Sequence, residues 1–185
     1  MPIVSAIPPE EAPISVRSFY QNGDPGPIAS TLAHVPELMK AALPFIGKAL
    51  GPSSIDFRTK EIVILRASAL LACRYCVNTH SVVARSAGLS TEEVLALRDT
   101  GSPSGAFPSE SDQALIAWTD ALSLGPVPIP GDLKSRVAAY FDEAEIVELT
   151  VLVGATLMLN RYATALELPV SAAHQAFLEQ EGLVY

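Results

Sequence analysis

The sequence is poor in the residues that most often carry protein chemistry. Its 185 residues include two cysteines, three histidines, one tryptophan and only 6% aromatic residues. Basic residues are also scarce, since 12 Lys and Arg stand against 20 Asp and Glu, which gives a net charge of −8 and a pI near 4.8. Proteins that hold a phosphate backbone need clustered basic residues, and none are clustered here. We therefore expect no nucleic-acid partner.

Targeting and membrane signals are lacking as well. The N-terminal residues, MPIVSAIPPEEAP, contain no basic leader followed by an apolar core. The longest uncharged apolar stretch, near 149–159, is far shorter than the about 20 residues that cross a bilayer. We therefore expect a soluble, cytoplasmic protein without a membrane partner. In that compartment a CxxC pair is normally a working dithiol.

The chain length and the positions of the prolines predict a single domain. Hydrophobic residues make up 49% of the sequence, which is ample for one core, and the chain is too short for two comfortable domains. Four prolines within residues 1–16 interrupt any periodicity. We expect residues 1–27 to form an extended, proline-rich arm and residues 28–185 to form one all-helical domain.

Apolar residues recur at three- and four-residue steps along every long segment, and no segment alternates with period two. This pattern predicts an all-α bundle of about seven helices. Asp56 is a candidate cap, Ser90 and Asp142 begin candidate capping boxes, and Pro36 marks a helix start or a kink. The expected helices cover about 28–50, 57–87, 90–99, 110–123, 132–140, 142–166 and 170–180.

A short internal echo suggests a helical duplication. EIVIL at 61–65 and EIVEL at 145–149 match in four of five positions at an offset of 84. The offset places Cys76 opposite Asn160, so only the first copy contains the cysteines. Convergence of two buried helix starts explains the match equally well.

Both cysteines lie in one stretch, CRYCVNTH, at residues 73–80. Positions three and four apart share a helix face, so Cys73 and Cys76 lie within disulfide reach and His80 follows Cys76 by one turn. The thiolate is the nucleophilic form of cysteine, and a neighbouring histidine can take the thiol proton. The motif predicts a redox centre with its own base.

Other interpretations of the same residues have to be weighed. A structural zinc site usually needs a second pair of ligands, whereas His34 and His174 are isolated. Haem attachment requires histidine directly after the second cysteine, where this chain has Val77. Two inert core cysteines on a buried helix remain a further possibility.

The spacing of Glu61, Cys73, Cys76 and His80, followed by an Ala-Gly-Leu helix end, resembles the alkylhydroperoxidase D and carboxymuconolactone decarboxylase superfamily, in its peroxidase-like branch. The resemblance is close over about 57–89 and looser over 141–169. It implies a helical bundle that assembles as a homo-oligomer, whether dimer, trimer or hexamer. It also implies reduction of organic hydroperoxides, with an external dithiol or lipoyl-type reductant and no metal, haem or other cofactor.

By the same resemblance, Glu61 is the proton-relay carboxylate, His80 the relay histidine, and Cys73 with Cys76 the redox pair. We expect Cys76 to attack the peroxide and Cys73 to resolve the product. Tyr75 stands where the best-known peroxidase of the family has a second histidine, and it is a weaker candidate for substrate binding or support. Tyrosine is a poor base at neutral pH because its reference pKa is about 10.

The relay places a geometric condition on the fold. Twelve residues at 100° each leave Glu61 and Cys73 about 120° apart on one unbroken helix, too far round to cooperate. An unbroken helix over 57–87 would also be about 46 Å long, which is long for this domain. We therefore expect a break near 72–73, with Gly88 ending the second half.

Two other function classes stay open. A decarboxylase or lactone-handling enzyme would gather cationic groups such as Arg66, Arg85 or Arg161 around His80 to hold substrate carboxylates. A non-enzymatic redox sensor would use the same two cysteines to switch an interface.

Overall fold

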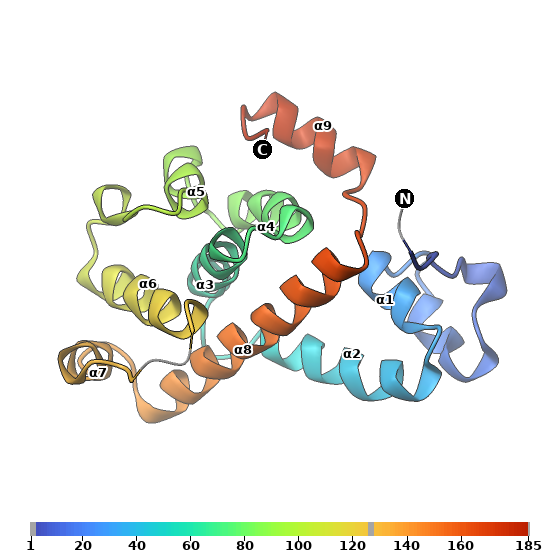
Figure 1. Cartoon of the computed structure of the whole chain (residues 1–185), viewed down its shortest axis with the longest axis horizontal. Helices are drawn as coiled ribbons and strands as arrows, with labels where there is room; N and C mark the ends of the chain where they lie inside the picture. The colour runs from blue at the N-terminus through green and yellow to red at the C-terminus, as the bar shows by residue number, and fades with distance from the viewer. Residues whose placement is uncertain (1–2, 126–127, 185) are drawn as a thin grey trace.

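The computed structural model describes residues 3–125 and 128–184, and within them it contains nine α-helices, three 3-10 helices and no strand (Figure 1). The all-α prediction is confirmed. Residues 1–2 of the predicted arm and residues 126–127 of the break before 132 lie outside the described residues. The α-helices are α1 (Pro27–Leu32), α2 (Pro36–Leu50), α3 (Phe57–Leu70), α4 (Arg74–Ser86), α5 (Thr91–Arg98), α6 (Glu110–Ser123), α7 (Gly131–Ala138), α8 (Glu143–Ala165) and α9 (Ala172–Gln180).

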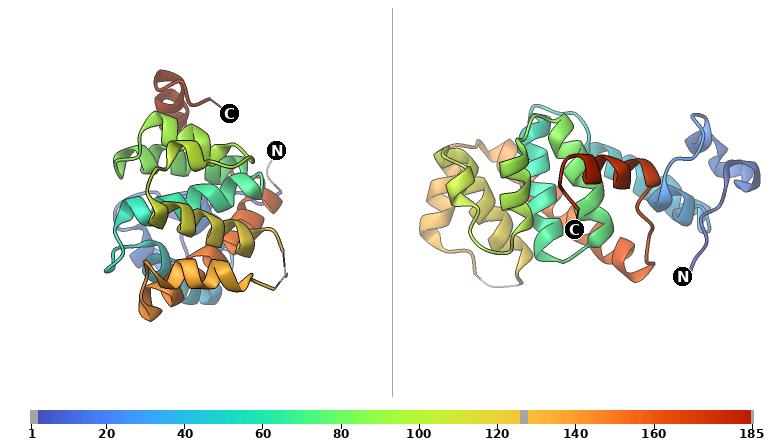
Figure 2. Two further views of the ribbon diagram at one scale, coloured as in Figure 1. Left: turned by 90° about the vertical axis from the view of Figure 1, so that its left-hand side faces the viewer. Right: turned by 90° about the horizontal axis from the view of Figure 1, so that it is seen from above.

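Helix α3 lies at the centre of the bundle, in contact with α4, α5, α6 and α8 (Figure 1). Helix α9 covers α4, and α7 packs on α6 at one end of the molecule. Helices α1 and α2 lie with the N-terminal residues at the other end, as the side and top views also show (Figure 2). α3 is buried on nearly all sides, since residues 60–69 are all buried, including the charged residues Lys60, Glu61 and Arg66.

The helix caps predicted from the sequence are present. The Asp56 carboxylate accepts a hydrogen bond from the Thr59 backbone N–H at 2.9 Å and caps α3. Ser90 and Asp142 each begin a complete capping box, at α5 and α8.

The expected break between the two halves of 57–87 is present. α3 ends at Leu70, Ala72 adopts a left-handed conformation with φ of 51°, and Cys73 is the N-cap residue of α4. The chain therefore reverses, and α3 and α4 pack side by side as a helical hairpin. Gly88 follows α4 with φ of 96°, as a helix stop requires.

The predicted extended arm is wrong for much of its length. Pro9–Glu11 and Ile14–Tyr20 are 3-10 helices, and α1 begins inside the arm at Pro27. Val16 and Tyr20, four positions apart, are buried in a small cluster with Met39 of α2, so the arm shares a core with the helices that follow it. Short 3-10 helices satisfy backbone groups locally, which lets a proline-rich segment bury these side chains.

The helix count also differs from about seven. The single helix expected at 28–50 is two helices, because Pro36 occupies the first position of α2, where its missing N–H costs nothing. α1 ends at Leu32, and the three residues between the helices form a turn.

Helix α8 extends through most of the bundle. With 23 residues and a mean hydropathy of 1.3 over its most apolar window, it is, among the described residues, the one helix with the length and composition to cross a membrane. It packs against α2, α3, α4 and α6 as a core helix does, and part of its surface remains exposed.

A buried ion pair joins α8 to α3. The Lys60 side chain is fully buried, and its ammonium lies 2.7 Å from the Glu148 carboxylate. The same ammonium donates to the carbonyl oxygen of Gly51, just after α2, at 2.6 Å. Lys60 therefore links α3 to α8 and to the end of α2, three segments whose side chains lie near the cysteines.

Candidate active site

The two cysteines lie in the first turn of α4. Cys73 is its N-cap residue, and its sulfur accepts a hydrogen bond from the Cys76 backbone N–H at 3.3 Å. The two residues are joined as a disulfide, with Cα atoms 5.3 Å apart. The predicted pairing of the two thiols is therefore sterically satisfied.

Glu61 and His80 meet across the helical hairpin. His80 Nδ1 lies 3.0 Å from Glu61 Oε2 and 3.3 Å from Oε1. The Glu61 side chain is 5% exposed and the His80 side chain 21%. Because a carboxylate only accepts, Nδ1 carries the proton, and Nε2 is left as the basic nitrogen.

A small cavity of about 50 Å³ lies beside these groups. Cys76, His80 and Tyr75 of α4 line one side of it. The remaining walls come from α1, α2, α3 and α8, through Ile28, Leu50, Ile64, Ser68, Thr156, Leu159 and Asn160. The four-residue spacing on α4 thus brings a cysteine and its candidate base to the same cavity, and the hairpin adds Glu61 behind the base.

The cavity distinguishes the two cysteines. Cys73 is completely buried and packs with Ala163 and Leu168, whereas Cys76 is 4% exposed and lines the cavity together with His80. A small molecule inside the cavity would contact the sulfur of Cys76.

Tyr75 lies between the cavity and the surface. It lines the cavity on one side, and on the other it lines a wider groove of about 320 Å³ together with Arg74 and Glu167. Burial, with the charge of Asp24 adding to it, raises the pKa of Tyr75 above its ordinary value of 10.0. Its hydroxyl is therefore neutral at physiological pH, which makes it a hydrogen-bond donor and excludes it as a general base.

Three polar side chains of the cavity were not singled out from the sequence. They are Ser68, Thr156 and Asn160, which are 0%, 2% and 1% exposed. The residues of α3 and α8 that line the cavity beside them are apolar. A polar residue inside an apolar helical run was the signal that could have identified them. Asn160 entered the sequence analysis only as the counterpart of Cys76 in the internal echo.

No group of three or more His, Cys, Asp or Glu side chains in residues 3–125 and 128–184 is arranged to hold a metal ion. His34, which a zinc site would have had to recruit, instead bonds through Nε2 to the Ser5 carbonyl at 2.8 Å, far along the chain from the cysteines.

Comparison with known proteins agrees with this geometry. A model of the carboxymuconolactone decarboxylase family matches residues 36–120, which include Glu61, both cysteines and His80. A crystal structure of a protein of unknown function from Agrobacterium tumefaciens, suggested to be the antioxidant defence protein AhpD, is 28% identical, with a TM-score of 0.69 over 76% of this chain and 95% of that one. These two findings support a relationship to the alkylhydroperoxidase D and carboxymuconolactone decarboxylase superfamily.

Two other similar proteins are an uncharacterized protein and a debrominase. The uncharacterized protein YnjA of Escherichia coli is 27% identical over 63% of this chain, and the match spans 63% of its own length. The debrominase Bmp8, solved in complex with 2,3,4-tribromopyrrole, has a TM-score of 0.77 over 97% of both chains at 21% identity. At that identity the likeness to Bmp8 shows the fold alone.

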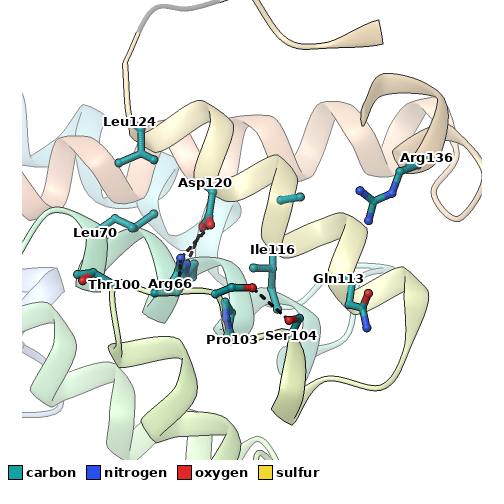
Figure 3. Close-up of a pocket in the computed structure, with 13 residues that line it drawn as sticks. Arg66, Leu70, Thr100, Pro103, Ser104, Gln113, Ile116, Asp120, Leu124 and Arg136 are labelled. Carbon is teal, nitrogen blue, oxygen red and sulfur yellow. Dashed lines mark hydrogen bonds and ion pairs between the residues drawn. The ribbon is translucent and has the colours of Figure 1, made fainter. Parts of the chain in front are cut away.

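The arginines that the decarboxylase branch would require are engaged elsewhere. Arg66 donates to the Asp120 carboxylate at 2.6 Å and to the Asp99 carbonyl at 2.5 Å. It lines a separate pocket of about 400 Å³ beside α6, where it points toward Asp120 (Figure 3).

The other two arginines also lie outside the lining of the His80 cavity. Arg85 donates to Glu181 and to the Leu89 carbonyl, and Arg161 is on the exposed side of α8. Among the described residues, neither these two nor Arg66 lines the cavity of Cys76 and His80. The expected carboxylate-holding cluster is therefore not formed.

Proposed function

We propose that this protein is a thiol-dependent peroxidase that reduces organic hydroperoxides with the Cys73 and Cys76 pair. The observation that carries the proposal is the cavity in which the Cys76 sulfur and the Glu61-oriented imidazole of His80 meet. A nucleophile, a base and a group that orients the base make up the arrangement that activates a thiol.

The oxidative step begins from the dithiol. His80 takes the Cys76 proton through Nε2, while Glu61 holds Nδ1 and stabilises the imidazolium that forms. The thiolate attacks the terminal oxygen of the hydroperoxide, and the O–O bond breaks. Cys76 becomes a sulfenic acid, and the alkoxide takes the proton from His80 and leaves as an alcohol.

Cys73 completes the reaction. Its thiol condenses with the sulfenic acid of Cys76, which forms the disulfide and releases water. An external dithiol, of which a lipoyl-type reductant is one kind, then reopens the disulfide by thiol exchange and becomes a disulfide itself. The buried position of Cys73 supports the assignment, since Cys73 needs to contact only Cys76.

We further propose that the protein works as a homo-oligomer that uses the exposed face of α8. Val147, Val151 and Met158 are 64%, 42% and 47% exposed and lie on one face of the helix. Two copies of α8 packed antiparallel about Gly154 would place exposed Arg161 of each copy opposite Val147 and within about one helical turn of exposed Glu143 of the other. This self-complementary charge pattern favours a second copy of the chain as the partner.

A steady-state assay with cumene hydroperoxide and excess dithiol tests the proposed activity. Multiple turnovers by the wild type, absent in Cys76→Ser, would support the peroxidase. A single stoichiometric oxidation without turnover would favour the redox sensor. If neither thiol were oxidised, the peroxidase and the redox sensor would both be ruled out, and the decarboxylase would have to be considered again.

A further inference from the structure

The floor of the Cys76 cavity carries an unused hydrogen-bond donor. Asn160 of α8 and Ser68 of α3 face each other there, and both are almost completely buried. The Ser68 hydroxyl donates to Asn160 Oδ1 at 3.1 Å, which holds the amide in one orientation. Asn160 Nδ2 has no hydrogen-bond partner within residues 3–125 and 128–184.

The other polar group of the floor is already satisfied. The Thr156 hydroxyl donates to the Leu152 carbonyl of its own helix at 2.8 Å, so it has no proton to offer to the cavity. A buried amide donor without a partner destabilises the folded protein, and native structures keep few of them. Asn160 Nδ2 therefore calls for a partner that enters the cavity from outside.

We propose that Asn160 Nδ2 binds the departing oxygen of the hydroperoxide and stabilises the negative charge that develops on it. The inference rests on the proposed peroxidase function and adds a catalytic residue that contacts the substrate. The ligand class is an alkyl hydroperoxide, whose inner oxygen accepts one hydrogen bond from the amide.

The step is balanced with the relay already described. Cys76 loses its proton to His80, and its thiolate forms a bond to the outer oxygen of the hydroperoxide. The O–O bond breaks with its electron pair on the inner oxygen, and Asn160 Nδ2–H donates to that oxygen as it becomes an alkoxide. His80 then returns the proton, so that thiol and hydroperoxide yield sulfenic acid and alcohol.

The division of roles follows from the geometry. The imidazole of His80 has one nitrogen committed to Glu61 and needs the other for the thiol proton. A preorganised neutral donor elsewhere in the cavity can stabilise the leaving oxygen without competing for that proton. Tyr75 is the rival donor because its neutral hydroxyl lines the same cavity.

The test compares two reactions of the same thiol. The reduced protein is mixed with cumene hydroperoxide, or with iodoacetamide at the same pH, and the second-order loss of Cys76 thiol is measured. Both reagents need the thiolate, but iodide leaves without requiring a hydrogen-bond donor. Asn160→Leu should slow the reaction with hydroperoxide by about 10² to 10³, the usual effect of removing one oxyanion donor, and should leave alkylation unchanged.

Two further variants serve as controls. Thr156→Val alters the same cavity floor but removes no free donor, so it should cause no loss that is selective for hydroperoxide. Tyr75→Phe removes the rival donor, and its selective loss should be smaller than that of Asn160→Leu. Should Asn160→Leu fail to fold by circular dichroism, Asn160→Ala removes the donor with a smaller neutral side chain that adds no charge beside the thiolate, and the same selective loss is expected.

The outcomes separate the inference from the proposed function. A wild type that hydroperoxide does not oxidise would overturn the function and the inference together. A wild type that is oxidised, with Asn160→Leu reacting equally fast, would overturn the inference alone. Equal losses in both reactions would also overturn it, since they would show that Asn160 only positions the thiol. A selective loss in Tyr75→Phe larger than that in Asn160→Leu would assign the role to Tyr75.

Discussion

His80 Nδ1 lies 3.0 Å from Glu61 Oε2, although the two residues are 19 positions apart and belong to different helices. The contact exists because the chain reverses at Ala72, which folds α4 back along α3. A nearly buried carboxylate beside an imidazole fixes the ring and stabilises its protonated form. Cys76 lies one turn before His80 on α4 and lines the same cavity.

The first prediction concerns this relay. His80→Ala removes the base, so alkylation of the reduced protein by iodoacetamide should require a higher pH than in the wild type. The hydroperoxide reaction at neutral pH should slow by about 10² to 10⁴, the usual contribution of a general base. Because the substitution shortens one side chain at the wall of an existing cavity, the helix content should not change, and the circular dichroism spectrum should stay the same.

Glu61→Gln provides the graded comparison. The amide keeps a hydrogen bond to the ring but no longer stabilises the imidazolium, so its alkylation curve should lie between those of the wild type and His80→Ala. Three superimposable curves, each with the unperturbed thiol pKa of about 8.5, would show that no relay operates.

The second prediction concerns stability against acid. The Lys60 ammonium and, secondarily, the Ser53 hydroxyl lower the pKa of Glu148 below its ordinary value of 4.5. A carboxyl whose pKa is lowered by folding stabilises the folded state above its unfolded pKa, and this stabilisation is lost as the pH falls through the lower folded pKa. The Tm of Glu148→Gln should therefore lie below that of the wild type at pH 7.

The pH series gives the sign of the effect. The difference in Tm between wild type and Glu148→Gln should persist down to about pH 4.5 and shrink at lower pH, as the wild-type carboxyl is protonated. Thermal melts across this range measure it. A difference that grew on acidification would contradict the assigned direction of the pKa shift.

The third prediction concerns self-association. Met158→Glu places a charge on the exposed apolar face of α8 and should dissociate the proposed oligomer, because a buried unpaired charge is costly at an interface. Leu95→Glu on α5 is the matched control, since both side chains are 47% exposed. Sedimentation velocity should give a smaller species for Met158→Glu alone. Equal behaviour of the two variants would place any interface elsewhere.

Local signals in the sequence predicted the elements around the site. The cap at Asp56 and the capping boxes at Ser90 and Asp142 depend on neighbouring residues only, and all three are present. The break before Cys73, predicted from the length of the segment, is also present. The contact between Glu61 and His80 needed one more step, because the helical angle between Glu61 and Cys73 demanded a reversal of the chain.

The features that were missed depend on contacts between distant segments. Val16 and Tyr20 are buried only because α2 supplies Met39, so a proline-rich segment that looked extended forms 3-10 helices. Lys60 is fully buried because Glu148 and the carbonyl after α2 surround its ammonium. Periodicity alone cannot reveal such a pairing, and it cannot show that Asn160 faces Ser68 across two helices.

The most direct measurement of the central claim locates the first product of the peroxide reaction. Reduced Cys73→Ser and reduced Cys76→Ser are each treated with one equivalent of cumene hydroperoxide and a sulfenic-acid trap, and the peptide at 73–80 is analysed by mass spectrometry. The account predicts a trapped sulfenic acid on Cys76 in Cys73→Ser, because no resolving thiol remains, and none on Cys73 in Cys76→Ser. Sulfenic acid on Cys73 alone would reverse the two roles, and its absence from both variants would contradict the peroxidase.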